Sequence, residues 1–175
     1  IYAIVGIILL ALVFVIGEER YGAKNWISIH GFALQPSEFV KILFVFFAAA
    51  LLARATRFLD IVRVTALAAV HVLILVAEKD LGAALIFFMT YLFIVYVSTE
   101  RFWILLAGLL CGAAAAVVAY HLFSHVQVRV TAWKDPWSTI DNAGYQVAQS
   151  LFAIGTGGWF GMGLGQGLPS RIPVA

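Results

Sequence analysis

Charged residues are scarce in this 175-residue chain, where Asp, Glu, Lys and Arg together make up 11% of the sequence. Soluble domains carry roughly 25%. Hydrophobic residues make up 63%, and the formal net charge is only +2. No cluster of Lys and Arg with interleaved aromatic residues occurs, which excludes nucleic-acid binding. The composition therefore predicts a membrane protein.

Cysteine is almost absent as well. Cys111 is the only one, so the chain builds neither a disulfide framework nor a cysteine-based metal site of its own. The sequence starts at Ile1 and runs directly into apolar residues, without the basic segment and small-residue cleavage site of a signal peptide. We expect an internal fragment of a longer protein, with sequence missing at both ends.

Long apolar runs make up most of the sequence. Five of them approach the roughly 20 residues that cross a bilayer core. Because lipid satisfies no backbone hydrogen bonds, and because these runs lack the alternation of barrel strands, they predict helices. The expected fold class is all-α, a polytopic transmembrane helix bundle forming a single membrane domain over residues 1–175. The predicted spans are about 1–16, 37–53, 61–77, 82–98 and 102–123.

A sixth apolar segment, about 145–155, is too short to cross a membrane. It predicts a short interfacial or re-entrant helix within an outer loop that covers residues 124–175. Short loops that carry Lys and Arg favour the cytoplasm. The loop over residues 124–175 lies on the other side of the membrane from those loops and is therefore assigned to the outside. The basic residues that set this orientation follow the second and fourth spans: Arg54, Arg57, Arg63 and Arg101.

Glu38 and Lys41 bring two charges into the start of the second predicted span. Charges inside membrane helices are costly and mark functional sites by default. The two residues are three apart, which puts them on one face of a helix. The alternative is a structural one, in which Glu38 caps the helix and Lys41 extends its ammonium toward the interface.

Asp80 follows Glu78 and Lys79 in a very short turn between two apolar segments. Three charged residues in such a turn are consistent with ordinary solvated loop residues. However, Asp80 begins a helix on the same side of the membrane as Glu38 and Lys41, so we expect the three to converge in one outward-facing cavity. A cavity lined by both acids and bases suits a substrate that carries hydroxyls and phosphates.

Other polar residues give weaker signals. His71 is alone inside the third span and is more typical of a hydrogen bond to a neighbouring helix than of a ligand. The glycine-rich run from Gly155 to Gly167 lacks the Gly-Lys-Ser/Thr ending of a phosphate-binding loop, so no nucleotide site is predicted. No catalytic triad and no metal-binding cluster are predicted.

Several short motifs, taken in order along nearly the whole chain, closely resemble the SEDS family of RodA, FtsW and SpoVE. The resemblance implies a ten-helix membrane protein, of which this chain would supply roughly the third to seventh helices and most of a large outer loop. The motifs are Gly22-Ala23-Lys24-Asn25-Trp26-Ile27, Gln35-Pro36-Ser37-Glu38 with Lys41, Asp80-Leu81-Gly82, and Gly144-Tyr145-Gln146 with Gln149-Ser150-Leu151.

The resemblance implies peptidoglycan glycosyltransferase activity. Family members polymerise lipid II at the outer face of the bacterial cytoplasmic membrane, together with a class B penicillin-binding protein, in elongation, division or sporulation. By resemblance, Glu38, Lys41 and Asp80 line the central cavity, and Arg129 matches a basic residue at the start of the large loop. The family's proposed catalytic Asp lies in a Thr-Asp-Phe motif that we expect beyond Ala175, so no catalytic base is assigned. No cofactor is assigned, although a divalent cation held by Glu38 and Asp80 stays open.

Two departures from the family pattern surround Asp80. The family usually has proline before the Asp and threonine after the Gly, whereas this chain has Lys79 and Ala83. Loss of the proline is expected to loosen the turn.

Two other functions stay open at this point. One is a lipid II flippase or transporter, because a polytopic bundle with charges in a cavity also suits transport. The other is a non-catalytic scaffold of the cell-wall synthesis machinery.

Overall fold

The computed structural model describes residues 1–20, 23–29, 32–167 and 171–172. Gly22 of the first family motif and the last three residues therefore lie outside the described residues. The chain divides into two compact units, Ile1–Leu109 and Leu110–Ala175, and each is described by itself. The single domain predicted over residues 1–175 stays a proposal.

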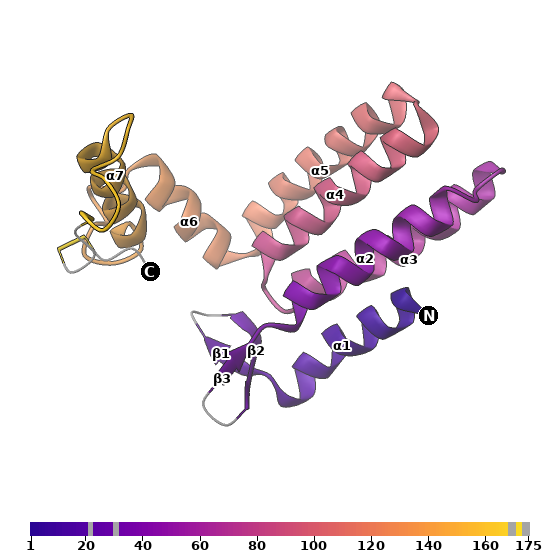
Figure 1. Ribbon diagram of the computed structural model, residues 1–175, viewed down its shortest axis with the longest axis horizontal. Helices are drawn as coiled ribbons and strands as arrows, with labels where there is room; N and C mark the ends of the chain where they lie inside the picture. The colour runs from indigo at the N-terminus through magenta and orange to yellow at the C-terminus, as the bar shows by residue number, and fades with distance from the viewer. Residues whose placement is uncertain (21–22, 30–31, 168–170, 173–175) are drawn as a thin grey trace. The chain divides into compact units, whose positions relative to one another are not determined.

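The first unit is built from antiparallel helices, which are joined by short turns except between the first and the second, where the connection holds a small sheet (Figure 1). Pro36 occupies the first turn of the second helix, where its missing N–H group removes no helical hydrogen bond. The connections that carry Arg54, Arg57 and Arg101 lie at the end of this unit opposite to Asp80. The helices are α1 (Tyr2–Ile16), α2 (Pro36–Leu52), α3 (Phe58–Ala77), α4 (Leu81–Thr99) and α5 (Phe102–Leu122), the last of which continues into the second unit.

Among the described residues, three helices are long and apolar enough to cross a membrane, namely α3, α4 and α5. The other two helices of the five predicted spans are shorter, with 15 residues in α1 and 17 in α2. The predicted fold class, an all-α polytopic membrane protein, is confirmed.

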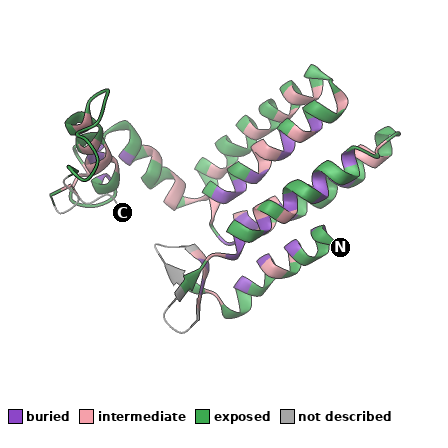
Figure 2. Ribbon diagram, in the orientation of Figure 1, coloured by how far each residue is buried: buried purple, intermediate pink, exposed green. Residues whose placement is uncertain are grey.

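The core of the first unit lies where α1, α2, α3 and α4 face one another, and the buried positions follow the inner faces of these helices (Figure 2). Phe44 on α2 is its centre, with its ring 4.7 Å from that of Phe87 on α4 and 5.2 Å from that of Phe47. Outward-facing residues are apolar as well, as expected for helices in lipid.

His71 is fully buried on α3, with its ring stacked on Phe47 at 5.3 Å. Its Nδ1 atom is 2.8 Å from the carbonyl oxygen of Leu67, one turn back on the same helix. This nitrogen bonds within its own helix, and the ring also interacts with the backbone of Ala3 on the neighbouring helix α1, in line with the expected contact between helices. Gly6 on α1 has room for no side chain here, because a Cβ atom would come within 2.9 Å of His71 Nε2. His71 thus fills the contact between helices rather than a ligand site.

The connection between α1 and α2 contains a small antiparallel sheet with strand order β1-β2-β3. The strands are β1 (Glu18–Arg20), β2 (Ala23–Ile29) and β3 (Phe32–Leu34). Lys24 ties β2 to α1, since its Nζ donates to the carbonyl oxygen of Phe14 at 2.6 Å. Asn25 and Ile27 are buried and alternate with less buried neighbours, which is the period of a strand with one face covered. The covered face of β2 thereby packs against helices α1 and α2.

The second unit contains the end of α5 followed by α6 (Ser124–Lys134) and α7 (Tyr145–Gly157). Ala132 on α6 and Ala148 on α7 are its buried residues of regular structure. Gly144 is the N-cap residue of α7 and lies at a close approach of the backbone, because a Cβ atom there would lie 2.5 Å from the carbonyl oxygen of Pro136. This explains the glycine of the Gly144-Tyr145-Gln146 motif.

Candidate functional site

The turn between α3 and α4 sets the position of Asp80. Helix α3 ends in a left-handed cap, with Lys79 at a φ of 62°. Two backbone hydrogen bonds close the turn, from Lys79 N to Val76 O at 3.0 Å and from Asp80 N to Leu75 O at 2.9 Å. The next helix then starts at once, with Asp80 as its N-cap residue. The turn is thus hydrogen-bonded at both residues, and the loosening expected from the missing proline stays a prediction.

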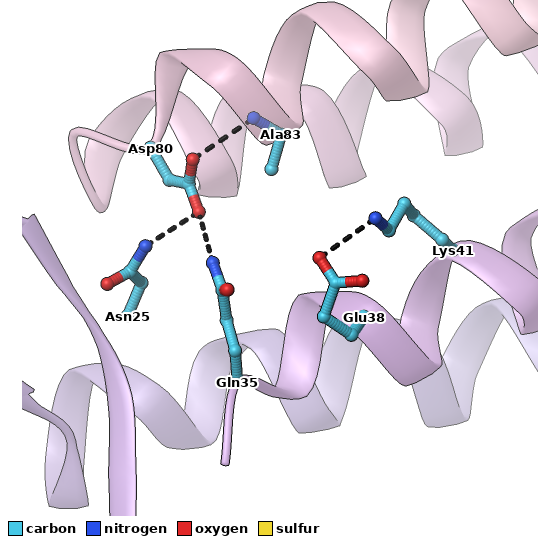
Figure 3. A network of polar contacts seen from close by, with 6 residues as sticks. All are labelled: Asn25, Gln35, Glu38, Lys41, Asp80 and Ala83. Carbon is cyan, nitrogen blue, oxygen red and sulfur yellow. Dashed lines mark hydrogen bonds and ion pairs between the residues drawn. The ribbon is translucent and has the colours of Figure 1, made fainter. Parts of the chain in front are cut away.

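The Asp80 carboxylate accepts three hydrogen bonds from three parts of the first unit (Figure 3). Oδ1 accepts from the backbone N–H of Ala83 at 3.0 Å. Oδ2 accepts from Asn25 Nδ2 on β2 at 2.7 Å and from Gln35 Nε2, at the start of α2, at 2.9 Å. The carboxylate is half-buried, and its position is fixed by the sheet and by two helix starts together.

Glu38 and Lys41 form an ion pair at the first turns of α2, with Lys41 Nζ 2.8 Å from Glu38 Oε1. Figure 3 shows this pair beside the Asp80 network, at the same end of the helices. The side chain of Lys41 is 29% exposed and that of Glu38 is 57% exposed. Glu38 also lies in the first turn, where the helix dipole favours a negative charge. The pair is accessible enough to meet a ligand.

The predicted site residues are thus distributed over both units. Glu38, Lys41 and Asp80 are at one end of the first unit, whereas Arg129 is an exposed residue of α6 in the second. No group of three or more His, Cys, Asp or Glu side chains suited to a metal lies within the described part of the chain. A divalent cation held by Glu38 and Asp80 stays a prediction.

The sequence alone does not reveal three features of this end of the unit. They are the hydrogen bonds from Asn25 and Gln35 to Asp80, and the burial of Glu78. Asn25 and Gln35 occur in the family motifs, but their hydrogen bonds span 55 and 45 residues of sequence, and no local period predicts such a pairing. Glu78 differs from the solvated loop residue considered above, since it is only 2% exposed. Its Oε1 atom is buried and has no hydrogen-bond partner among the described residues.

Glu78 makes stability depend on pH. Burial, and then the negative charge of Asp80, raises the pKa of Glu78 from 4.5 to about 8. The folded protein keeps the proton that the unfolded chain loses above its lower pKa, so stability falls as pH rises from about 4.5 to about 8. We expect Glu78→Gln to flatten this dependence, measured as the melting temperature of the full-length protein in detergent between pH 5 and pH 9. Parallel profiles for the two proteins would contradict the assignment.

Lys79 is strained by its left-handed backbone. A non-glycine residue there costs about 1 kcal/mol, so Lys79→Gly should raise the melting temperature. Lys79→Pro should lower it by a larger amount, because proline fixes φ near −65° and removes the N–H that bonds Val76. Thermal unfolding of the two variants beside wild type checks this. A stabilising proline, as the family pattern suggests, would mean that the turn takes another form.

The helices and their polar end define a polytopic membrane protein with a charged site at the start of two helices. The family model for FtsW, RodA and SpoVE, described as a cell cycle protein, matches residues 1–173. The chain belongs to this family.

Named relatives agree with the family model. The chain is 42% identical over 174 residues to the peptidoglycan glycosyltransferase RodA of Mycobacterium bovis, a match that covers 90% of this chain and 37% of the relative. It is 34% identical over 170 residues to the probable peptidoglycan glycosyltransferase FtsW of Aeromonas salmonicida, covering 94% and 43%. The chain therefore spans about two fifths of the length of these relatives.

A solved structure is also similar. One chain of a peptidoglycan synthase complex, studied for the coordination of polymerization and crosslinking, aligns with a TM-score of 0.68 at 31% identity. The alignment covers 90% of this chain and 48% of that one. The agreement extends the family assignment from sequence to fold.

Proposed function

We propose that the full-length protein is a peptidoglycan glycosyltransferase that polymerises lipid II at the outer face of the bacterial cytoplasmic membrane. The observation that carries the proposal is the 42% identity, over 174 residues, to a relative named for this activity. The charged end of the first unit supports it, because a substrate with sugar hydroxyls and a pyrophosphate needs both anionic and cationic partners.

In the proposed reaction, the 4-hydroxyl of one lipid-linked disaccharide attacks the anomeric carbon of another. A carbon–oxygen bond forms between the sugars, the bond to pyrophosphate breaks, and undecaprenyl pyrophosphate leaves. The hydroxyl proton passes to a general base, a role that typically contributes about 10²- to 10⁴-fold. We assign no base among residues 1–175, and by family resemblance it belongs to a Thr-Asp-Phe motif that this sequence does not contain.

The proposed role of the residues in this chain is to bind and orient the substrate. Lys41 supplies positive charge to the pyrophosphate as its negative charge develops, an electrostatic role that works best with groups already in position. Arg129 is assigned the same role by family resemblance alone. Glu38 and Asp80 accept hydrogen bonds from sugar hydroxyls or hold a divalent cation. A class B penicillin-binding protein is the proposed partner, in line with the synthase complex that the similar solved chain belongs to.

Purified full-length protein tests the proposal directly. Incubated with lipid II and a class B penicillin-binding protein, it should produce a ladder of glycan chains on a gel, whereas heat-inactivated protein should produce none. If the intact complex leaves lipid II as the monomer, the proposed activity is wrong.

A further inference from the structure

The donors that hold the Asp80 carboxylate in the described part of the chain are all neutral. The three hydrogen bonds come from a backbone N–H and from the neutral side-chain amides of Asn25 and Gln35. The ion pairs between described residues join Lys41 to Glu38 and Arg63 to Asp60, and neither involves Asp80. Neutral donors orient a carboxylate while leaving its full negative charge for another partner.

The three bonds also leave part of the carboxylate's acceptor capacity unused. An ionised carboxylate has about four lone-pair sites, and the donors from β2, from the start of α2 and from α4 occupy three of them. The two amides converge on Oδ2, and Ala83 takes Oδ1 (Figure 3). The plane of the carboxylate is therefore fixed, and one acceptor direction on Oδ1 stays open.

Stability alone does not explain Asn25. The residue is 8% exposed, and its Oδ1 atom is buried without a hydrogen-bond partner among the described residues. A buried, unsatisfied amide oxygen destabilises the fold, and an apolar side chain at this place in β2 would avoid that cost. Buried polar groups that break a packing rule in this way are expected at functional sites.

We propose that Asn25 and Gln35 are positioning residues, which fix the Asp80 carboxylate so that it meets a sugar hydroxyl of the lipid-linked substrate. The inference rests on the proposed function and deepens it, because it ties the sheet between α1 and α2 to the reacting end of the molecule. Neither residue acts on the substrate itself. Both act through Asp80.

Removal of one amide tests the proposal in the full-length protein. Asn25→Leu should lower kcat for lipid II polymerisation by about 100-fold, the loss expected when a group at the reaction centre is misplaced by about 1 Å. The change in KM should be smaller, because other contacts bind the substrate. Ser28→Ala is the matched control on the same strand: it removes a 2.6 Å hydrogen bond to Glu18 and should keep the wild-type kcat. Gln35→Met gives a second, independent removal should Asn25→Leu fail to fold.

An exchange of the two side chains separates positioning from structural support. Asn25→Asp alone places two carboxylates together and should lower both melting temperature and kcat. Asn25→Asp combined with Asp80→Asn restores an amide–carboxylate hydrogen bond, with Gln35 turning its amide to match, and the asparagine side chain at the start of α4 still serves as its cap. The melting temperature should recover, whereas polymerisation should stay lost.

Two results would overturn the inference while leaving the proposed function intact. One is wild-type kcat in both Asn25→Leu and Gln35→Met. The other is recovery of kcat together with stability in the exchanged protein, which would make the contact structural only. If the wild-type protein forms no glycan chains, the proposed function fails, and the inference fails with it.

Discussion

Asp80→Asn in the full-length protein is expected to lower lipid II polymerisation by about 100-fold or more, the loss that follows when a group that orients the reacting atoms is removed. The fold should survive, because asparagine is as good an N-cap residue as aspartate and still accepts the hydrogen bond from Ala83. What is lost is the negative charge and one acceptor for the two amides. Activity and melting temperature, measured on the same preparation, check the two parts of the prediction.

Asp80→Ala serves as the comparison for the asparagine variant. It removes the cap as well as the charge, so stability should fall by about 1 kcal/mol in addition to the loss of activity. Normal polymerisation by Asp80→Asn, with stability unchanged, would remove Asp80 from the site. Equal losses of stability in both variants would instead show that the carboxylate is needed for folding.

The second large effect is expected at the ion pair on α2. Lys41→Met should abolish polymerisation, because the pyrophosphate loses the cation that the first unit supplies, while stability should change by less than about 1 kcal/mol for this partly exposed pair. The exchanged variant, Glu38→Lys with Lys41→Glu, keeps an ion pair but reverses its polarity. Polymerisation should stay lost in that variant too, as measured by the yield of glycan chains.

Helix α3 offers a matched control for the ion pair. Asp60 and Arg63 are also three residues apart, with 3.6 Å between their charged atoms. Arg63→Met should leave polymerisation near the wild-type rate. Activity in the exchanged Glu38 and Lys41 variant would support the structural alternative, in which Glu38 only caps the helix and Lys41 only reaches toward the interface.

The sequence predicts the fold class because hydrophobic length is a local property. Apolar runs and the prolines and charges between them indicate the helices without knowledge of the partners. The sheet between α1 and α2 is not predicted, because its strands have only three, seven and three residues. In the longest strand, moreover, the buried position at Asn25 is polar, which hides the usual alternation of hydrophobic and polar residues.

The sequence predicts the charged residues of the site but not the hydrogen bonds that hold them. Glu38, Lys41 and Asp80 are conspicuous in the sequence because charges are costly beside lipid. The partners of Asp80 are not conspicuous, since Asn25 and Gln35 are neutral and approach it only through the folding of distant segments. The burial of Glu78 is hidden for a similar reason, as it depends on packing around a turn whose sequence resembles a solvated loop.

Lys79 departs from the family pattern in the turn that precedes Asp80. The missing proline suggests a looser turn when only the sequence is read. The backbone instead adopts a left-handed cap that proline does not permit, and both flanking N–H groups bond to α3. The turn that positions Asp80 is therefore built differently from the one that the family motif implies.

The most direct test of the account places the full-length protein in lipid vesicles with lipid II on the outer face and follows glycan chains and lipid translocation in the same sample. We predict glycan chains that require the protein and its class B penicillin-binding partner, and that disappear with Asp80→Asn. Translocation of lipid II without any glycan chains would contradict the account and would favour a transporter.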